Sequence, residues 1–277
     1  MRSVIMHISD LHAGPPFNLE ISEQLALQAH EIKPDLLVVS GDLVQRADFL
    51  YQWRTIVAYL KTLPQPQLIV PGNHDVPLFN LFYRFFFPLK YYQKAISLNV
   101  NPVFTQPGLA VVGGCTAYGM TLDGGWLSLK QQTIMEQQFA GFEDTVCKVA
   151  VLHHPVIKPF KSNFRSRVAN ADVVIRLLDR CKVDLLLSGH LHFSIVQMLK
   201  GLTPDLRPSM ILSMTGTATS RRGRGYGYGQ NSFHLITIDE EAILIQPFFY
   251  HLQAKRFFSV AEYRFLRKPP NYSMNSK

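Results

Sequence analysis

Cysteine is scarce in this chain of 277 residues, which contains three, at Cys115, Cys147 and Cys181. The number is odd and no two of them form a C-x-x-C pair, so the sequence does not encode the disulfide framework of a small secreted protein. All three lie in apolar stretches. We therefore expect reduced thiols in the core of a cytoplasmic protein.

Long apolar runs are also missing, because none reaches the roughly 18 residues that a membrane-spanning helix needs. The first apolar stretch starts at Val4, so we expect no signal peptide. No internal repeat or low-complexity segment interrupts the chain, and 47% of its residues are hydrophobic. This length and composition fit a single domain over residues 1–277. The sequence leaves the oligomeric state open.

Acidic residues are outnumbered, with 20 Asp and Glu against 28 Lys and Arg, and residues 200–277 carry +6 of the net charge of +8. Part of this excess lies in the Gly-, Arg- and Tyr-rich stretch Ser220–Gln230. That stretch is either a solvated connection or a loop that contacts a substrate phosphate through Arg221, Arg222 and Arg224. It is short and not repeated, so we expect no dedicated nucleic-acid binding.

Five short polar motifs stand in order along the chain, and each follows an apolar stretch typical of a β-strand. The motifs are Asp10-Leu11-His12, Gly41-Asp42, Gly72-Asn73-His74-Asp75, His153-His154-Pro155 and Gly189-His190-Leu191-His192. The stretches before them are Val4–Ile8, Leu36–Ser40, Leu68–Val70, Val149–Leu152 and Asp184–Ser188. Because sites in open α/β sheets gather at the carboxyl ends of strands, we expect the motifs to meet.

Segments with the apolar spacing of helices separate these strands. They cover Glu20–Ile32, Phe49–Thr62, Leu129–Phe139 and Ala171–Cys181. The alternation indicates an α/β fold with buried, largely parallel strands in the motif-bearing portion, residues 1–192. Residues 193–277 contain four more strand-like stretches, which we expect to complete a second sheet, and a basic, aromatic tail from Tyr263. The four stretches are Phe193–Leu199, Ser209–Thr215, Ser232–Asp239 and Ala242–Phe249.

The carboxylate, amide and imidazole groups of the motifs are the ligands that a pair of catalytic metal ions needs. Phosphodiester hydrolysis requires charge neutralisation and a nucleophile stronger than water at neutral pH, and two ions about 3.5–4 Å apart supply both. The group that bridges them must be a carboxylate, because one imidazole nitrogen cannot bind two ions. Asp42 suits this task, since Gly41 before it allows a tight turn.

The motif set D-x-H, G-D, G-N-H-D, H-H-P and G-H-x-H closely resembles that of the calcineurin-like metallophosphoesterases, in particular the bacterial class III of cyclic-nucleotide phosphodiesterases. The resemblance covers residues 4–192, and no motif is altered. It implies a four-layer α/β/β/α sandwich of two mixed sheets flanked by helices. It also implies a phosphodiesterase in which a metal-bridging hydroxide attacks phosphorus. Ligands without thiolate suit Mn, Fe, Zn or Co, with manganese and iron first on family grounds.

The resemblance further assigns a role to each motif residue. One ion is expected on Asp10, His12, Asp42 and His192, and the other on Asp42, Asn73, His153 and His190. His74 is expected to face the substrate phosphate as a catalytic residue, with Asp75 orienting its imidazole. Independently of the resemblance, His154 should point away from the site if its segment stays extended, which favours a structural or supporting role over a metal ligand.

The stretch that follows the G-N-H-D motif, Val76–Tyr92, has eight aromatic residues among its 17. Core packing, a protein interface and a surface in contact with lipid headgroups are all open for Phe79–Tyr92. The lipid-facing interpretation favours an alternative function, a membrane-peripheral pyrophosphohydrolase resembling the UDP-diacylglucosamine hydrolases. An inactive metal-binding scaffold is a further alternative, which the intact ligand set disfavours. The expected partner is a small phosphodiester or a lipid-linked phosphate.

Overall fold

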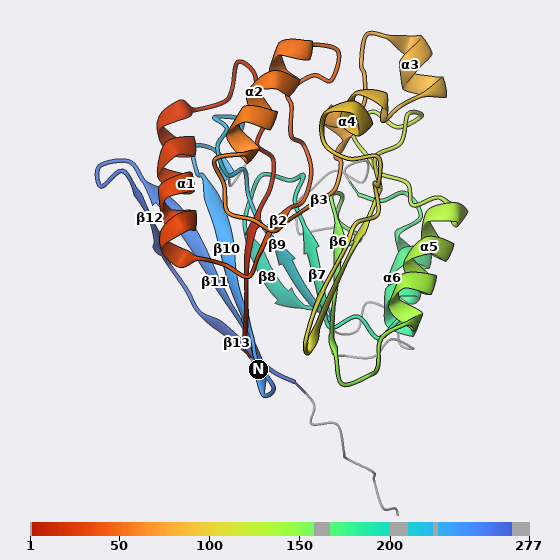
Figure 1. Ribbon diagram of the computed structural model, residues 1–277, viewed down its shortest axis with the longest axis vertical. Helices are drawn as coiled ribbons and strands as arrows, with labels where there is room; N and C mark the ends of the chain where they lie inside the picture. Colours follow the sequence, from red (N-terminus) through yellow and green to blue (C-terminus); the bar gives the residue numbers. More distant parts are fainter. Residues whose placement is uncertain (1, 158–166, 200–209, 224–226, 268–277) are drawn as a thin grey trace, which may run out of the picture.

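Leu- and Val-rich strands form two β-sheets that lie face to face, with helices on both outer sides (Figure 1). The computed structural model describes residues 2–157, 167–199, 210–223 and 227–267. Both sheets are mixed, because each combines parallel and antiparallel neighbours. The predicted four-layer α/β/β/α architecture is confirmed.

The first sheet has the strand order β12-β11-β10-β1-β2-β3, with β13 paired to β11. Its strands are β1 (Ser3–Ile8), β2 (Leu36–Val39), β3 (Gln67–Ile69), β10 (Ser232–Ile238), β11 (Ala242–His251), β12 (Arg256–Ser259) and β13 (Tyr263–Leu266). β1, β2 and β3 are parallel, whereas β10 pairs antiparallel with the other edge of β1. The four residues of β2 are all buried, as expected for a parallel strand covered on both faces.

The second sheet has the order β4-β5-β6-β7-β9-β8. Its strands are β4 (Val103–Gln106), β5 (Leu109–Gly114), β6 (Cys147–Leu152), β7 (Leu185–Ser188), β8 (Ile195–Met198) and β9 (Ile211–Met214). The central strands β5, β6, β7 and β9 are parallel to one another. β4 pairs antiparallel with β5 at one edge, and β8 pairs antiparallel with β9 at the other.

The four helices predicted from apolar spacing are present, together with two short helices in the aromatic stretch. The helices are α1 (Leu19–Ile32), α2 (Leu50–Leu60), α3 (Leu81–Phe86), α4 (Lys90–Ala95), α5 (Leu129–Ala140) and α6 (Ala171–Arg180), and a 3-10 turn, η1, covers Asn73–Asp75. α1 shows why such segments are helical: the Asn18 side chain caps its first turn by accepting from the Ile21 amide at 3.3 Å. Ile21, Leu25 and Ala29 then form one buried face.

Three apolar layers hold the sandwich together. One lies between the sheets, one between the first sheet and α1, α2 and α4, and one between the second sheet and α5 and α6. The three cysteines are buried and form no disulfide among the described residues, which agrees with the expected reduced core thiols. Among the described residues, no helix has both the length and the apolar character needed to cross a bilayer.

The final strands differ from the prediction that they would all complete one second sheet. β8 and β9 do extend the second sheet, and β9 is parallel to β7, but β10 and β11 join the first sheet. The reason is the burial of β1, whose backbone needs hydrogen-bonding partners on both edges, and β10 supplies the partner opposite β2. The tail from Tyr263 begins as β13 on the edge of β11, and residues 268–277 lie outside the described ranges.

Candidate metal centre

Loops at the carboxyl ends of β1, β2 and β7 bring four buried side chains together. Asp10, His12, Asp42 and His192 place one carboxylate oxygen or imidazole nitrogen each within 4.8 Å of the others. His192 Nε2 lies 3.1 Å from Asp10 Oδ1 and 3.1 Å from His12 Nε2. His12 Nε2 is 3.7 Å from Asp42 Oδ2. These four residues are the ones predicted to hold the first ion.

A second set of side chains lies on the other side of Asp42. His153 Nε2 is 3.3 Å from Asp42 Oδ1 and 3.2 Å from Asn73 Oδ1. The His190 ring packs edge-on against that of His153, with their centroids 5.2 Å apart. The two oxygens of Asp42 therefore face opposite sets of imidazoles, which is the placement a bridging carboxylate requires.

His154 belongs to this second set, and the prediction that it points away is wrong. Its ring centroid lies 4.8 Å from that of His153 and 4.7 Å from that of His190, and the three form a group with metal-ligand spacing. The physical reason is that β6 ends at Leu152, so the alternation of an extended strand does not continue through the two histidines. His154 Nδ1 bonds Thr116 Oγ1 at 2.8 Å, and its Nε2 has no partner.

Five of the predicted ligands have left-handed backbone conformations. They are Asp10 (φ 54°), His12 (φ 49°), Asp42 (φ 54°), His190 (φ 74°) and His192 (φ 59°). Such conformations are uncommon outside glycine, although Asp and His adopt them more readily than β-branched residues. Their concentration at strand ends turns consecutive side chains toward one point, a pattern typical of functional sites.

Two glycines let the motifs approach each other. A Cβ on Gly72 would lie 2.5 Å from the backbone nitrogen of Asp42, and one on Gly189 would lie 2.5 Å from Asp10 Oδ2. Any larger residue at either position would push the two halves of the site apart. The glycines of the G-N-H-D and G-H-x-H motifs are therefore steric requirements for this geometry.

Backbone groups orient the imidazoles from behind. His153 Nδ1 donates to the carbonyl of Ser40 at 2.7 Å, and His192 Nδ1 donates to the carbonyl of Arg222. In the neutral ring, each bond assigns the proton to Nδ1 and directs Nε2 into the site, as a metal ligand requires. The backbone amide of His190 donates to Asp10 Oδ2 at 2.9 Å and so fixes the orientation of the Asp10 carboxylate.

Unpartnered buried atoms provide a test of whether metal ions fit. Within the described part of the chain, Asp10 Oδ1 and both ring nitrogens of His190 are buried without a hydrogen-bond partner. Buried polar atoms are normally satisfied, because an unsatisfied one costs about 1–3 kcal/mol. These atoms point to cations as their partners, and an oxygen and nitrogen donor set without thiolate fits Mn, Fe, Zn or Co.

Electrostatics agree with this interpretation. Burial acts to raise the pKa of Asp10, but the neighbouring His192 and His12 outweigh it and hold that pKa well below its usual range. Burial likewise opposes ionisation of Asp42, and His153 and His74 lower its pKa in turn. Burial would lower the pKa of His153, but the charge on Asp42 outweighs it and raises that pKa to about 9, so a metal ion at Nε2 would have to displace a proton that this charge holds. The two carboxylates are thus anionic and suited to cations.

His74 stands beside the ligands in η1, with its ring centroid 4.9 Å from that of His12. Its Nδ1 is 2.7 Å from the Gln45 carbonyl and 2.8 Å from Arg46 Nη1. Its Nε2 is 2.7 Å from Arg222 Nη1. Burial lowers the pKa of His74 to about 3, so the ring is neutral near pH 7. The structure therefore surrounds His74 with two guanidinium groups.

The arginines near His74 were only partly predicted from the sequence. Arg222 reaches the site as expected, whereas Arg221 is exposed and Arg224 lies outside the described residues. Arg46 was not predicted. The available signal was its position four residues after Asp42, in the loop that leaves the G-D motif.

Asp75 does not orient His74, so that expectation is wrong. Its Oδ1 accepts from the amides of Leu43 at 2.9 Å and Val44 at 3.2 Å, and its Oδ2 accepts from the amide of Gly72 at 2.8 Å. Three backbone donors saturate a carboxylate that is fully buried. Asp75 therefore fixes the loop after β2 against the loop after β3, and the Gln45 carbonyl takes over the orientation of His74.

Comparison with known proteins agrees with this geometry. The family model of calcineurin-like phosphoesterases matches residues 3–194. YkuE, an uncharacterised metallophosphoesterase of Bacillus subtilis, is 34% identical over 73 residues, which are 26% of this chain and 26% of that protein. The match thus spans about a quarter of this curated relative.

Two solved structures share the fold at low sequence identity. Purple acid phosphatase PPD1 from yellow lupin (Lupinus luteus) seeds is 12% identical, with a TM-score of 0.72 over 95% of this chain and 53% of its own. A dimetal phosphatase from Danio rerio is 12% identical, with a TM-score of 0.67 over 95% of this chain and 98% of its own. At this identity the likeness concerns the fold alone.

Proposed function

The chain belongs to the calcineurin-like phosphoesterase family, a family of binuclear metal-dependent phosphoester hydrolases, and from this premise we propose that it is a phosphodiesterase. One observation carries the proposal: the Asp42 carboxylate lies between two sets of buried ligands, with His12 facing one oxygen and His153 the other. Two divalent ions bound there supply charge neutralisation at the phosphate and a nucleophile at neutral pH. The motif context of H-H-P and G-H-x-H favours diesters over monoesters.

The chain's own residues bind and orient the phosphate in this proposal. Arg222 Nη1 and His74 Nε2 lie 2.7 Å apart beside the ligand sets, so a phosphate that displaces this contact meets both groups. In the neutral ring Nδ1 donates to the Gln45 carbonyl at 2.7 Å, and Nε2 is the nitrogen that accepts from Arg222. Arg222 then contributes a fixed positive charge to the phosphate, and His74 donates to a phosphate oxygen or to the leaving oxygen once Nε2 has taken up a proton, which the negative charge of the phosphate favours.

Hydrolysis of bis-p-nitrophenyl phosphate and p-nitrophenyl phosphate by Mn²⁺-loaded protein tests the proposal, with Asp42→Ala as the control. We expect cleavage of the diester in preference to the monoester, and loss of both activities in the variant. Preference for the monoester would contradict the diesterase assignment. Failure to cleave either substrate with Mn, Fe, Zn or Co would contradict the hydrolase assignment for simple esters.

A second candidate is hydrolysis of a lipid-linked pyrophosphate, which the exposed aromatic side chains of α3 favour. Phe82 and Phe86 are 62% and 68% exposed, and α3 starts six residues after Asp75. Exposed rings of this kind suit an enzyme that takes a substrate with a large apolar tail from a membrane. UDP-diacylglucosamine is the substrate to compare with the soluble diester. We also propose a cytoplasmic location, because the three cysteines are buried and form no disulfide among the described residues.

A further inference from the structure

The segment between η1 and α4 exposes large apolar side chains instead of burying them. With the neighbouring loop 118–122 it forms what we call the apolar surface, whose members are each at least half exposed. They are Phe79 (64%), Phe82 (62%), Phe85 (50%), Phe86 (68%), Met120 (68%) and Leu122 (70%). Single exposed apolar residues are ordinary, but a contiguous set marks an interaction site. Of the three interpretations left open for this stretch, core packing does not hold for Phe82, Phe85 and Phe86 on α3.

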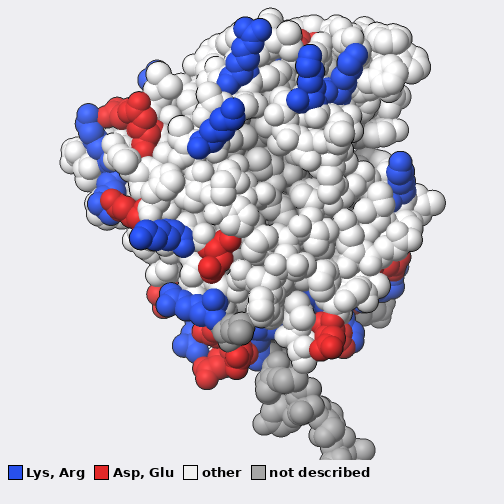
Figure 2. Space-filling model, in the orientation of Figure 1, with Lys and Arg blue, Asp and Glu red and all other residues white. Residues whose placement is uncertain are grey.

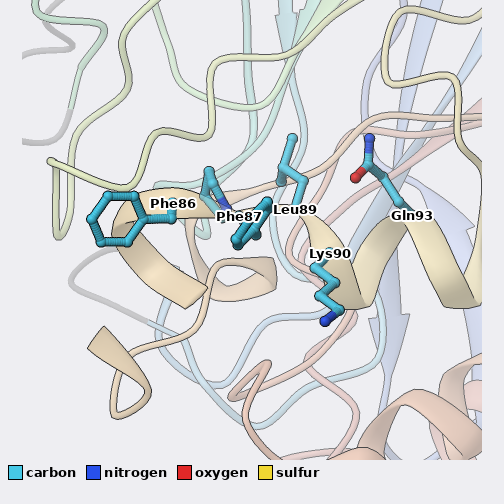
Figure 3. Close-up of a pocket in the computed structure, with 6 residues that line it drawn as sticks. Phe86, Phe87, Leu89, Lys90 and Gln93 are labelled. Carbon is cyan, nitrogen blue, oxygen red and sulfur yellow. The ribbon is translucent and has the colours of Figure 1, made fainter. Parts of the chain in front are cut away.

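The exposed rings are in contact with one another. Phe82 lies 5.3 Å from Phe86 and 6.0 Å from Phe87 between ring centroids, and Phe79 lies 6.1 Å from Phe49. A cavity of about 490 Å³ opens between the end of α3 and the start of α4. Phe86 and Phe87 line it together with Lys90 and Gln93 (Figure 3). The surface thus combines a ridge of rings with a hollow that has a lysine at its rim.

The apolar surface is held rigidly although its rings face outward. The carboxylate of Asp48 accepts from the amides of Leu78 at 2.7 Å and Asn80 at 2.8 Å. The guanidinium of Arg84 is nearly buried and donates to the carbonyls of Pro77 at 2.7 Å and Thr121 at 2.5 Å. These bonds fix both ends of α3 and its contact with loop 118–122. A partner that binds here pays little ordering entropy.

The charge around the apolar surface is mainly positive. Residues 76–122 contain Arg84, Lys90 and Lys94 and no Asp or Glu, while Asp123 follows directly after Leu122 and the carboxylate of Asp48 binds the amides before α3. Lys90 and Lys94 are exposed, and in the part of the chain that the structure describes neither is paired with a carboxylate. α2, which packs beside α4, adds the exposed Arg54 and Lys61. On the face shown in Figure 2, Lys and Arg side chains gather over the part where Figure 1 places α2 and α4, and the corner where Figure 1 places α3 is largely white.

We propose that the apolar surface docks on an anionic lipid bilayer, with the rings of α3 inserted at headgroup depth and Lys90 and Lys94 on lipid phosphates. Aromatic rings beside Lys and Arg are the composition that favours the interface of an anionic membrane. A second copy of this chain fits less well, because a two-fold dimer would bring the same positive residues face to face. The surface follows His74 closely in sequence, so docking places the metal centre near the bilayer.

Vesicle sedimentation tests the proposal, using mixed vesicles with one phosphatidylglycerol for every two phosphatidylcholines. We expect the wild type to sediment with these vesicles, and weakly with pure phosphatidylcholine. Phe82→Ser with Phe86→Ser should lower the bound fraction on the order of tenfold. Lys90→Gln should weaken binding about fivefold on the anionic vesicles alone. Phe258→Ser is the matched control, because Phe258 is 49% exposed but lies on β12, away from α3 (Figure 1).

Two further measurements keep the inference separate from the diesterase proposal. Hydrolysis of the soluble bis-p-nitrophenyl phosphate should be unchanged in the Phe82→Ser/Phe86→Ser variant, which also shows that the variant is folded. Light scattering after gel filtration should find the same mass for variant and wild type. The proposal would be overturned if the wild type did not bind vesicles, or if variant and wild type bound equally. It would also be overturned if the wild type were a dimer and the variant a monomer.

Discussion

Arg222 tests the site at the scale of a single residue. Its Nη1 lies 2.7 Å from His74 Nε2 and 3.1 Å from Gln45 Oε1, so it presents a positive charge where the phosphate is expected. Arg222→Gln removes that charge and should lower kcat/KM for the diester about 10- to 100-fold, or about 1.5–3 kcal/mol, the worth of a charge-assisted hydrogen bond. Steady-state kinetics of the Mn²⁺-loaded variant measure it.

Arg221 is the matched control, because it is the adjacent residue and carries the same charge but is exposed. Arg221→Gln should leave kcat/KM within about twofold, since surface charges several residues from a ligand are screened. Equal losses in the two variants would mean that the general positive field of the loop, and not the contact with His74, attracts the substrate.

At this scale the sequence predicted ligands better than it predicted contacts around them. The motif residues Asp10, Asp42 and His153 come together as expected, because each stands directly after a strand. The positions of Arg46 and His154 depend on loop conformations that spacing does not encode. Asp75 was expected on His74 because the two are neighbours in sequence, but its carboxylate turns to three buried amides instead.

Asp75 belongs to the scale of elements, because it joins the loop after β2 to η1. Replacing it by Asn exchanges one carboxylate oxygen for a donor, which leaves a buried amide of Leu43 or Gly72 without an acceptor. We expect Asp75→Asn to lower the free energy of unfolding by about 2 kcal/mol, measured by urea denaturation of metal-free protein. Asp48→Asn is the comparison, since it alters amides of the exposed segment Leu78–Asn80.

The comparison gives a clear contrast. Water can replace the acceptor at the amides that Asp48 holds, so its variant should lose less than about 1 kcal/mol. If Asp75→Asn lowered the free energy of unfolding no more than Asp48→Asn, this would contradict the inference that Asp75 joins the loop after β2 to the loop after β3.

Helices and strands that carry an apolar period were predictable, and strained or short elements were not. α1 and α6 have buried residues at helical spacing, so they are readable from the sequence. The left-handed conformations of Asp10 and Asp42 could not be predicted in this way, because an aspartate, unlike a glycine, is not typical of positions with positive φ. α3 escaped prediction because its aromatic residues face solvent, so burial periodicity carries no signal there.

At the scale of the whole molecule, His234 links the two sheets. It lies in β10 of the first sheet, fully buried, with Nδ1 2.7 Å from Ser213 Oγ in β9 and Nε2 2.6 Å from Ser194 Oγ. The sequence gives no sign of this link, because only the stacking of two sheets brings the serines opposite the histidine. His7 is also fully buried, in β1, with its ring 6.2 Å from that of His234.

Burial lowers the pKa of His234 to about 3. In the unfolded chain the His234 imidazole binds a proton near pH 6.5, whereas in the folded chain it stays neutral at that pH. The free energy of unfolding therefore decreases as the pH falls below about 6.5. The burial of neutral His234 should lower the free energy of unfolding by about 2 kcal/mol at pH 5 relative to pH 7. His234→Gln should show a correspondingly flatter decline in urea unfolding of metal-free protein. An equal decline in both proteins would contradict the link between burial of His234 and acid sensitivity.

The central claim is that two metal ions share Asp42, and the metal content of purified protein, measured by inductively coupled plasma mass spectrometry, tests it most directly. We predict about two ions per chain in the wild type. Asp42→Ala should lose both or retain one weakly, because each ligand set contains one of the two Asp42 oxygens. His74→Ala should keep both ions while turnover falls about 10²- to 10⁴-fold. Two ions retained in Asp42→Ala, or both lost in His74→Ala, would contradict the account.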